Sequence, residues 1–251
     1  MAILRCQNVF FEEVTAILFD KDGTLANSQH FLKQLAAARS RLLEPWVPGV
    51  APHLMAAFGC AHETYDPTGL MAVGTRYENE IAAATYVAAT GRSWGESLKI
   101  AQKVFSESDR CFSRKAQHTP PFAGILTLLR TLHSCGLKLA VLSGDTTANV
   151  QDFINCYDLA DIIEWCAGSE KAPIKPDPLM VWNACQQLGV SPEQSIVVGD
   201  SVLDYQLAHH SQAKAFVSVT WGHSPIVAGA DVTLTQPHQL HVILDKDSAQ
   251  E

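Results

Sequence analysis

The chain has 251 residues, of which 47% are hydrophobic and 18% charged, a composition typical of a soluble protein with one large domain or two modest ones. Its net charge is −8 without a basic run, so nucleic acid is a poor candidate partner, and no apolar stretch is long enough to span a membrane. Its seven cysteines include no Cys-x-x-Cys pair and do not suggest a disulfide framework, so we expect reduced thiols and a cytoplasmic location.

The first predicted element is a buried strand that leads into Asp20. Residues 16–19 are Ala-Ile-Leu-Phe, and an apolar run without polar alternation is typical of a strand buried on both faces. The next run of this kind comes much later in the chain, and the sequence between them favours helices. Ser93 and Glu96 have the spacing of a capping box, which predicts the start of one helix. We therefore predict that residues 28–117 form a helical insertion, or cap domain.

After Pro120 the pattern changes to alternating helices and strands. Amphipathic helical faces separate short apolar runs. The predicted strands cover residues 137–142, 162–163, 196–198, 215–219 and 231–234. Such alternation predicts an α/β fold in which helices cover both faces of a parallel sheet. Residues 1–27 and 118–251 should then form one core domain, with the helical cap inserted into it.

Polar residues follow three of these strands, at the edge where open parallel sheets bind their ligands. The segment Asp20–Thr24 follows the first strand, and Ser143–Asp145 follows the second. Asp200 follows the fourth strand, with Asp204 one helical turn further on. Lys175 stands just before the helix that follows the third strand. Because neighbouring parallel strands end at one edge, we expect these side chains to lie together.

Four carboxylates at one edge would repel one another strongly unless a cation lies among them. Hard oxygen ligands favour Mg²⁺ or Ca²⁺ over softer metals. A phosphate would supply further ligands and would need the backbone N–H groups of the glycine turns at Gly23 and Gly144, while Lys175 could balance the remaining charge. An EF-hand loop is excluded, because its required Gly and Glu are replaced by Leu25 and Phe31.

These residues resemble the four ordered motifs of the haloacid dehalogenase superfamily. Asp-Lys-Asp-Gly-Thr at Asp20–Thr24 is similar to the first motif, Ser143 to the second and Lys175 to the third. Gly199-Asp200-x-x-x-Asp204 is similar to the fourth. The resemblance spans nearly the whole chain and implies a Rossmann-like, doubly wound parallel sheet. The insertion resembles the helical cap of the phosphoglycolate phosphatase and β-phosphoglucomutase branch.

The resemblance implies a phosphatase that works through an aspartyl-phosphate. Asp20 resembles the nucleophile, and Asp22 resembles the general acid that protonates the leaving alcohol and then the base that activates water. Ser143 and Lys175 complete the implied catalytic set by holding the phosphoryl group. The implied magnesium ligands are Asp20, the backbone carbonyl of Asp22, Asp200 and, directly or through water, Asp204. The implied phosphate-binding residues are Gly23, Thr24, Ser143, Gly144 and Lys175.

Four further positions bear on specificity and on the departures from this pattern. In the cap, Arg76 is the candidate contact for a substrate carboxylate or second phosphate, and the alternative is an exposed surface arginine. Lys21 stands where the relatives often have an apolar residue, and we expect its side chain to point away from the phosphate. Asn27, at the cap hinge, replaces an aspartate that many relatives have. Asp145 is interpreted as the N-cap of the following helix.

The predicted substrate is a small phosphorylated metabolite, such as phosphoglycolate or a similar phospho-acid. A phosphomutase of the β-phosphoglucomutase type is an alternative, because it shares every core residue and differs in retaining a bisphosphate intermediate. A phosphonatase would need a cap lysine, for which Lys33 is the nearest candidate. A catalytically idle binding protein is disfavoured because no acidic motif residue is missing. A monomer and a homodimer are both compatible with the sequence.

Overall fold

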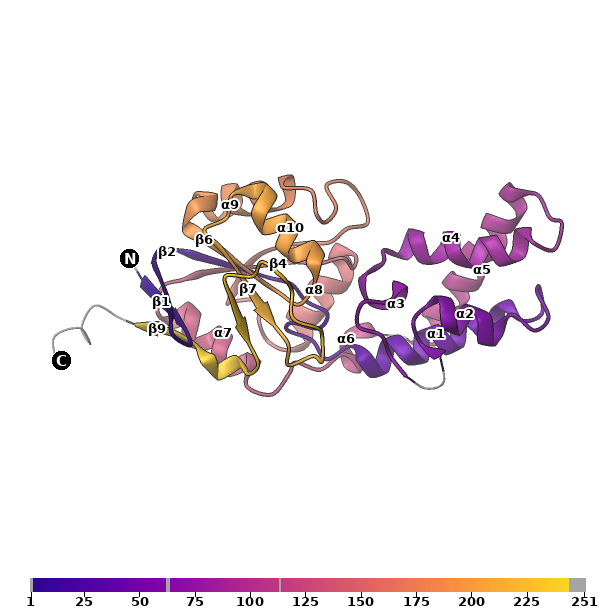
Figure 1. Cartoon of the computed structure of the whole chain (residues 1–251), viewed down its shortest axis with the longest axis horizontal. Helices are drawn as coiled ribbons and strands as arrows, with labels where there is room; N and C mark the ends of the chain where they lie inside the picture. The colour runs from indigo at the N-terminus through magenta and orange to yellow at the C-terminus, as the bar shows by residue number, and fades with distance from the viewer. Residues whose placement is uncertain (1, 62–63, 113, 244–251) are drawn as a thin grey trace. The chain divides into compact units, whose positions relative to one another are not determined.

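The computed structural model describes residues 2–61, 64–112 and 114–243, and the chain forms two compact units (Figure 1). One unit contains the residues up to Asn27 together with those from Pro120 onwards, and the other is Ser28–Thr119. Every described strand belongs to the first unit, whereas the regular elements described in the second are helices.

A six-stranded parallel sheet forms the centre of the first unit and confirms the predicted α/β class. Its strands, in spatial order, are β5 (Ile163–Ala167), β4 (Lys138–Leu142), β3 (Ala16–Phe19), β6 (Ser195–Gly199), β7 (Ala215–Val219) and β8 (Val232–Leu234). Each neighbouring pair is parallel. The strands β3, β6 and β7 are buried at every position, which is why their sequences are mostly apolar, with Ser195 and Ser218 as buried polar exceptions.

Helices cover this sheet on both faces, as the doubly wound prediction requires. They are α7 (Ile125–Ser134), α8 (Thr147–Cys156), α9 (Leu179–Leu188) and α10 (Val202–Ser211). The helices α9 and α10 pack together over one face, where their apolar residues share a core with Leu18 of β3 and Phe216 of β7. Figure 1 shows α7 on the opposite side of the sheet from α9 and α10. Because side chains alternate along a strand, each strand contributes to the cores on both faces.

A second, antiparallel sheet was not foreseen from the sequence. It has the order β2-β1-β9 and consists of β1 (Ala2–Cys6), β2 (Val9–Val14) and β9 (Leu240–Ile243). A two-residue turn joins β1 to β2, with Gln7 at a φ of +55°. The strand β9 lies near the other end of the chain and pairs antiparallel with β1, from Cys6 opposite Leu240 to Ile3 opposite Ile243. This sheet closes the core unit beside α7, which contacts β9.

The second unit has its own apolar core. Its helices are α1 (Gln29–Leu43), α2 (Ala51–Ala57), α3 (Leu70–Val73), α4 (Arg76–Ala88), α5 (Trp94–Arg110) and α6 (Lys115–His118). Phe58 and Phe105 are fully buried in this core and meet edge to face. Thr75 and Glu78 form a capping box at the start of α4. At α5, Ser93 accepts from the backbone N–H of Glu96, as predicted, while the Glu96 carboxylate lies near Arg92.

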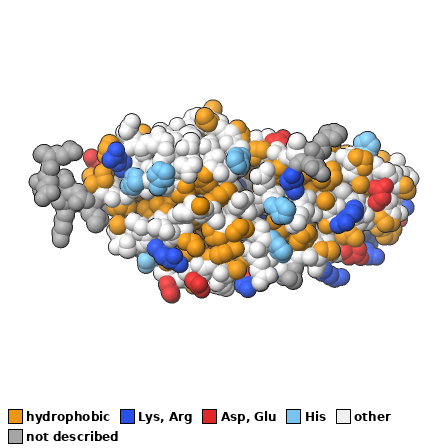
Figure 2. All heavy atoms as spheres, turned by 90° about the horizontal axis from the view of Figure 1, so that it is seen from below, with side chains coloured by type: hydrophobic (Ala, Val, Ile, Leu, Met, Phe, Trp, Pro, Cys, Tyr) orange, Lys and Arg blue, Asp and Glu red, His pale blue; other side chains and the backbone are white. Residues whose placement is uncertain are grey.

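The described residues show no basic patch on the face drawn in Figure 2, and they include no membrane-spanning helix. On the face drawn in Figure 2, Lys and Arg side chains occur singly or in small groups among apolar and neutral ones. Within residues 2–61, 64–112 and 114–243, none of the helices combines the length and the apolar character needed to cross a bilayer.

Candidate active site

The polar residues that follow the central strands emerge at one edge of the parallel sheet. Phe19, the last residue of β3, lies beside Val141 of β4 and Val198 of β6. The backbone N–H of Asp20 donates to the carbonyl of Val198 at 2.8 Å, which fixes the end of β3 against its neighbour. Asp200 follows β6 directly, so the register alone brings these two carboxylates together.

Lys175 is a buried cation that bridges two carboxylates. Its Nζ donates to Oδ1 of Asp20 and to Oδ1 of Asp204, both at 2.6 Å. The side chains of Lys175, Asp20 and Asp204 are 7%, 9% and 1% exposed. Charges so far removed from water need close partners, so the three side chains hold one another in place.

Burial and mutual repulsion shift the pKa values of these groups. Burial raises the pKa of Asp20 to about 6 against the lowering effect of Lys175, and the charge of Asp204 raises it as well. Burial also raises the pKa of Asp200 well above its ordinary value, and the charges of Asp20 and Asp204 add to that effect. For Lys175, burial lowers the pKa, but Asp20 and Asp204 outweigh burial and raise it above its ordinary value. The cluster therefore carries more negative charge than its one lysine balances.

The side chains of Asp20, Asp200 and Asp204 fit a divalent cation. One oxygen from each carboxylate lies within 4.8 Å of the other two. Oδ2 of Asp20 is buried and has no hydrogen-bond partner among the described residues, so this atom can accept a ligand. Carboxylate oxygens are hard ligands that suit Mg²⁺. The charge fits too, because three ionised carboxylates and one lysine leave a surplus that a divalent cation would neutralise.

Asp204 uses both of its oxygens within the protein. Oδ1 accepts from Lys175, and Oδ2 accepts from the hydroxyl and the backbone N–H of Ser201 at 2.6 and 3.1 Å. Ser201 in turn caps α10, because its hydroxyl accepts from the backbone N–H of Asp204. The Ser-x-x-Asp spacing is a signal from which this cap could have been predicted. Of the two modes of metal binding implied for Asp204, its engaged oxygens favour binding through water.

Gly23 is required both by its backbone conformation and by the proximity of Asp200. Its φ is +89°, and a Cβ at this position would lie 2.1 Å from Oδ2 of Asp200. Its N–H donates to the carbonyl of Ala26 at 2.9 Å, so in this conformation that N–H is not open to a phosphate. Thr24 differs, because its buried Oγ1 has no hydrogen-bond partner among residues 2–61, 64–112 and 114–243. Of these two predicted phosphate-binding residues, Thr24 has the available polar atom.

Ser143 stands at the end of β4 with its hydroxyl oriented by the next turn. Its Oγ accepts from the backbone N–H of Asp145 at 3.1 Å, and the side chain is almost fully buried. An oxygen that already accepts leaves the hydroxyl proton available for donation, which suits the predicted contact with a phosphoryl oxygen. Beside it, a Cβ on Gly144 would meet no atom within 4 Å, so this position lies next to open space.

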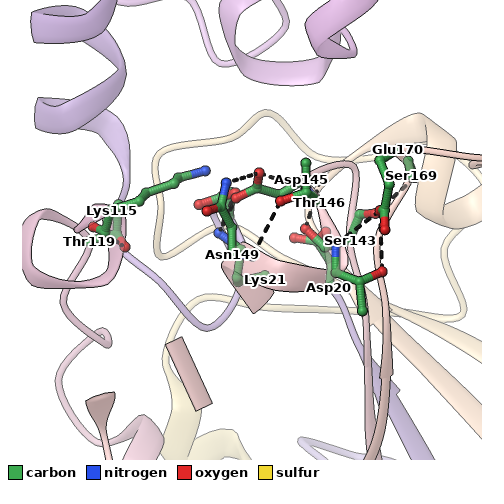
Figure 3. Close-up of polar contacts among 12 residues, drawn as sticks. Asp20, Lys21, Lys115, Thr119, Ser143, Asp145, Thr146, Asn149, Ser169 and Glu170 are labelled. Carbon is green, nitrogen blue, oxygen red and sulfur yellow. Dashed lines mark hydrogen bonds and ion pairs between the residues drawn. The ribbon is translucent and has the colours of Figure 1, made fainter. Parts of the chain in front are cut away.

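Asp145 is not the N-cap of α8, and this expectation was wrong. Thr146 caps the helix by accepting from the backbone N–H of Asn149. The Asp145 carboxylate instead accepts from the backbone N–H of Thr146 and from Nδ2 of Asn149, both at 2.8 Å. It also forms an ion pair with Lys21, and Figure 3 shows Lys21, Asp145 and Asn149 gathered near Asp20 and Ser143. An aspartate and a threonine that are neighbours can each cap a helix. Here Thr146 is the cap, and the carboxylate of Asp145 pairs with Lys21 instead.

Lys21 is a second buried cation in this region. Its side chain is 1% exposed, and its Nζ lies 2.6 Å from Oδ2 of Asp22 and 3.1 Å from Oδ2 of Asp145. The lysine therefore contacts the predicted acid–base residue itself. From the sequence, Lys21 was expected only to point away from the phosphate, and no role at the site was foreseen for it.

Two supporting residues from the segment after β7 were also missed. The hydroxyl of Ser224 donates to Oδ2 of Asp200 at 2.5 Å. The indole Nε1 of Trp221 donates to the carbonyl of Thr24 at 2.8 Å. Both lie far along the chain from the residues that they contact. No local sequence pattern marks them. They reach the site because β7 lies beside β6 in the sheet, so the segments that follow these two strands are neighbours.

The predicted substrate residue Arg76 lies in the helical unit and makes ion pairs within it. Its Nε donates to Glu80 at 2.9 Å, and its Nη1 donates to Asp109. The side chain remains 42% exposed. Its proposed contact with a substrate carboxylate stays a prediction.

A comparison with protein-family models identifies the class of protein. The model of haloacid dehalogenase-like hydrolases matches residues 14–211, which is most of the chain. The chain therefore belongs to the haloacid dehalogenase-like hydrolases, and the resemblance inferred from its four motifs is confirmed.

Curated relatives of similar length carry a more particular name. The chain is 25% identical over 246 residues to a phosphoglycolate phosphatase of Shigella boydii, with 92% of this chain and 90% of the relative covered. It is 27% identical over 231 residues to a phosphoglycolate phosphatase of Neisseria meningitidis, with the same coverage of 92% and 90%.

Solved structures share the fold. A predicted phosphoglycolate phosphatase from Haemophilus somnus is 21% identical, with a TM-score of 0.67 over 89% of this chain and 95% of that one. A haloacid dehalogenase-superfamily hydrolase of subfamily IA from Geobacter sulfurreducens is 18% identical, with a TM-score of 0.60 over 90% of this chain and 94% of that one. These likenesses support the doubly wound core with a helical cap that the sequence predicts.

Proposed function

We propose that this chain is a Mg²⁺-dependent phosphatase that hydrolyses a small phosphomonoester through an aspartyl-phosphate on Asp20. The observation that carries the proposal is the state of the Asp20 carboxylate. One oxygen accepts from the buried Lys175, while the other is buried and has no partner among the described residues. A nucleophile held by a cation on one side and available on the other suits attack on phosphorus.

The proposed reaction has two steps at Asp20. In the first, a carboxylate oxygen of Asp20 forms a bond to phosphorus while the bond to the ester oxygen breaks, and Asp22 gives its proton to the leaving alcohol. In the second, Asp22 takes a proton from water, which attacks the same phosphorus and returns Asp20 as a carboxylate. With a pKa of about 6, Asp20 is mostly ionised at neutral pH, as a nucleophile must be.

Other residues would hold the phosphoryl group during both steps. Lys175 supplies a fixed positive charge beside Asp20, and the hydroxyls of Ser143 and Thr24 are the proposed donors to phosphoryl oxygens. Asp20, the carbonyl of Asp22 and Asp200 would hold Mg²⁺, with Asp204 acting through water. When bound, the metal would neutralise charge on the carboxylates and on the transferring group.

The proposed substrate class is a small phospho-acid, with phosphoglycolate as the first compound to test. The curated relatives named phosphoglycolate phosphatase support this choice, because they align over nearly their whole length. Arg76 remains the proposed contact for the acid group, although it would have to exchange one of its ion pairs to bind it. The seven cysteines are free thiols, which agrees with a proposed cytoplasmic location.

The experiment that tests this function measures phosphate release from a panel of phosphomonoesters with Mg²⁺ or with EDTA. We expect Mg²⁺-dependent turnover that Asp20→Asn abolishes. Asp161→Asn is the matched control, because Asp161 is an exposed aspartate of the same unit that precedes β5, away from the carboxyl ends of the strands, and its change should leave turnover intact. Acid-quenched wild type should carry phosphate on Asp20, detected by peptide mass spectrometry.

Two outcomes would contradict the proposal. Absence of release from every ester by folded protein with Mg²⁺ would favour a mutase or a binding role, and conversion of a sugar phosphate into its isomer would identify the mutase. Turnover that survives in Asp20→Asn would exclude Asp20 as the nucleophile.

A further inference from the structure

Lys21 occupies an unusual position for a lysine. It immediately follows the proposed nucleophile, yet its side chain is almost fully buried and its amine lies between the carboxylates of Asp22 and Asp145. A buried ammonium is costly unless carboxylates compensate it, so a neutral apolar residue would be the simpler choice for filling this space. The chain thus keeps a charge at a place where packing alone does not require one.

Asp145 anchors this lysine to the rest of the core unit. One carboxylate oxygen accepts from the backbone N–H of Thr146 and from Nδ2 of Asn149, and the other lies 3.1 Å from Nζ of Lys21. Asn149 belongs to the first turn of α8, whose start is capped by Thr146. A connected set of contacts therefore runs from a helix terminus through Asp145 to Lys21 (Figure 3). From Lys21 it continues to Asp22.

We propose that Lys21 is a positioning residue that holds the carboxyl group of Asp22 toward the leaving-group oxygen. This inference rests on the proposed phosphatase function. The Asp22 side chain is 19% exposed, so its direction depends on the side chains that it contacts. A general acid works only within hydrogen-bond reach of the atom that it protonates. The 2.6 Å contact with Lys21 fixes one oxygen of Asp22 and so sets the direction of the whole group.

A purely structural role for Lys21 predicts a different pattern of effects. Loss of a structural charge would disturb the whole site and slow all substrates alike. Loss of a positioning contact to Asp22 would slow only those substrates whose leaving group needs a proton. An alkoxide such as that of glycolate leaves poorly without protonation, whereas 4-nitrophenolate leaves readily without it. The leaving-group dependence therefore separates the two roles.

The test compares Lys21→Met with wild type in the first turnover, with Mg²⁺ present. Met keeps the length of the side chain and removes the charge. We expect release of glycolate from phosphoglycolate to slow by roughly 10–100-fold, and release of 4-nitrophenol from 4-nitrophenyl phosphate by less than about threefold. Lys138→Met is the matched control, because Lys138 is a partly buried lysine of the same unit that donates to the Leu188 carbonyl at the other end of β4. This control should slow neither release selectively.

Asp145→Asn provides a second variant if Lys21→Met fails to fold by circular dichroism. Asn keeps the shape of Asp145 and removes the charge that anchors Lys21. We therefore expect glycolate release to slow more than 4-nitrophenol release, as in Lys21→Met, but by a smaller factor. Equal slowing of both esters, or no slowing of either, would overturn the positioning role while leaving the phosphatase function intact. If wild type releases neither leaving group, the phosphatase function itself fails, and the inference fails with it.

Discussion

The two units each bury a basic side chain among carboxylates, but the two clusters differ in charge balance. In the core unit, Lys175 lies against Asp20 and Asp204, and Asp200 adds a third carboxylate within reach. One oxygen of Asp20 has no hydrogen-bond partner among the described residues. This cluster sets one lysine against three carboxyl groups.

The cluster in the helical unit is balanced by comparison. Arg39 is 5% exposed, and its guanidinium stacks 4.1 Å from the ring centroid of Phe105. Its Nη2 lies 3.6 Å from Asp109, which also accepts from Arg76, and Arg76 pairs with Glu80. Two arginines thus meet two carboxylates. Burial lowers the pKa of Arg39 to about 10, although the charge of Asp109 raises it, so the guanidinium stays charged at neutral pH.

The difference shows how a buried ionic cluster can indicate a ligand site. Arg39 has counter-charges and an aromatic face, and it connects α1 to α5 without any need for a further ion. Lys175 cannot neutralise its surroundings, so the core cluster is costly until a cation joins it. We infer that the Arg39 cluster stabilises the fold. The Lys175 cluster instead keeps an excess of carboxyl groups that favours binding of a cation.

The largest expected effect is the loss of activity in Lys175→Met. Removal of this lysine deletes the only basic partner described for Asp20, and we expect phosphate release to fall by roughly 10²–10³-fold or more, because a fixed charge at the transferring group is lost. Arg39→Met should keep most of the turnover when both variants are folded. Steady-state phosphate release with saturating Mg²⁺ measures the turnover of both variants. Comparable losses in the two variants would break the distinction between the clusters.

The next effect concerns stability as a function of pH and Mg²⁺. The pKa of Asp20 is raised from 3.8 to about 6 on folding, so its contribution to stability is fully present below pH 3.8 and is lost as pH rises through 6. The raised pKa of Asp200 acts in the same direction. We therefore expect Mg²⁺ to raise the melting temperature strongly at pH 7.5 and little at pH 4.5, where protons compete with the metal.

The control for this pH dependence is Asp20→Asn. Carboxylates with lowered pKa values, such as Asp66 and Glu170, change stability with the opposite sign, so the raw profile of the wild type mixes several groups. The difference in the free energy of unfolding between wild type and Asp20→Asn, measured in EDTA from pH 4 to pH 8, isolates the contribution of the cluster. The variant should gain stability relative to wild type as pH rises. A constant difference would show that Asp20 has an ordinary pKa.

The sequence predicted the parallel sheet well but not the antiparallel one, for a physical reason. Strands such as β3 and β6 are buried on both faces, so their sequences are continuous apolar runs. In β2 the positions from Val9 to Glu12 alternate between half-buried and exposed, and two glutamates precede the buried Val14. Its partner β1 also pairs with β9 from near the other end of the chain, and no local pattern reports such a pairing.

At the site, the sequence predicted which residues lie close together but not their contacts. Asp20, Lys175 and Asp200 could be expected together because strand order brings neighbouring strand ends to one edge. The partners of Lys21 could not be predicted, because they depend on the turn that Gly23 makes and on a carboxylate supplied by the loop after β4. For the same reason Asp145 was interpreted as a cap, since its ion pair is a tertiary contact.

The smallest expected effect is the loss of stability in Arg39→Met. Met can keep contact with the ring of Phe105, but Asp109 then has Arg76 as its basic partner in the described cluster. Because Asp109 is 40% exposed, water can solvate it, and the loss should be about 1–3 kcal/mol in the free energy of unfolding, less than for a fully buried pair. Urea unfolding measures this value.

Arg92→Met is the matched control for that change. Arg92 belongs to the same unit, pairs with Glu96 at 3.7 Å in an i,i+4 arrangement and donates to the carbonyl of Trp46, and the ion pair should contribute about 0.5 kcal/mol or less. If Arg39→Met costs no more than this control, the buried arginine does not stabilise the helical unit. If it also changes the Mg²⁺-induced rise in melting temperature, the two clusters are coupled. A stability loss larger than that of the control, with an unchanged Mg²⁺ effect, would show that the Arg39 cluster stabilises the fold independently of the cluster around Asp20.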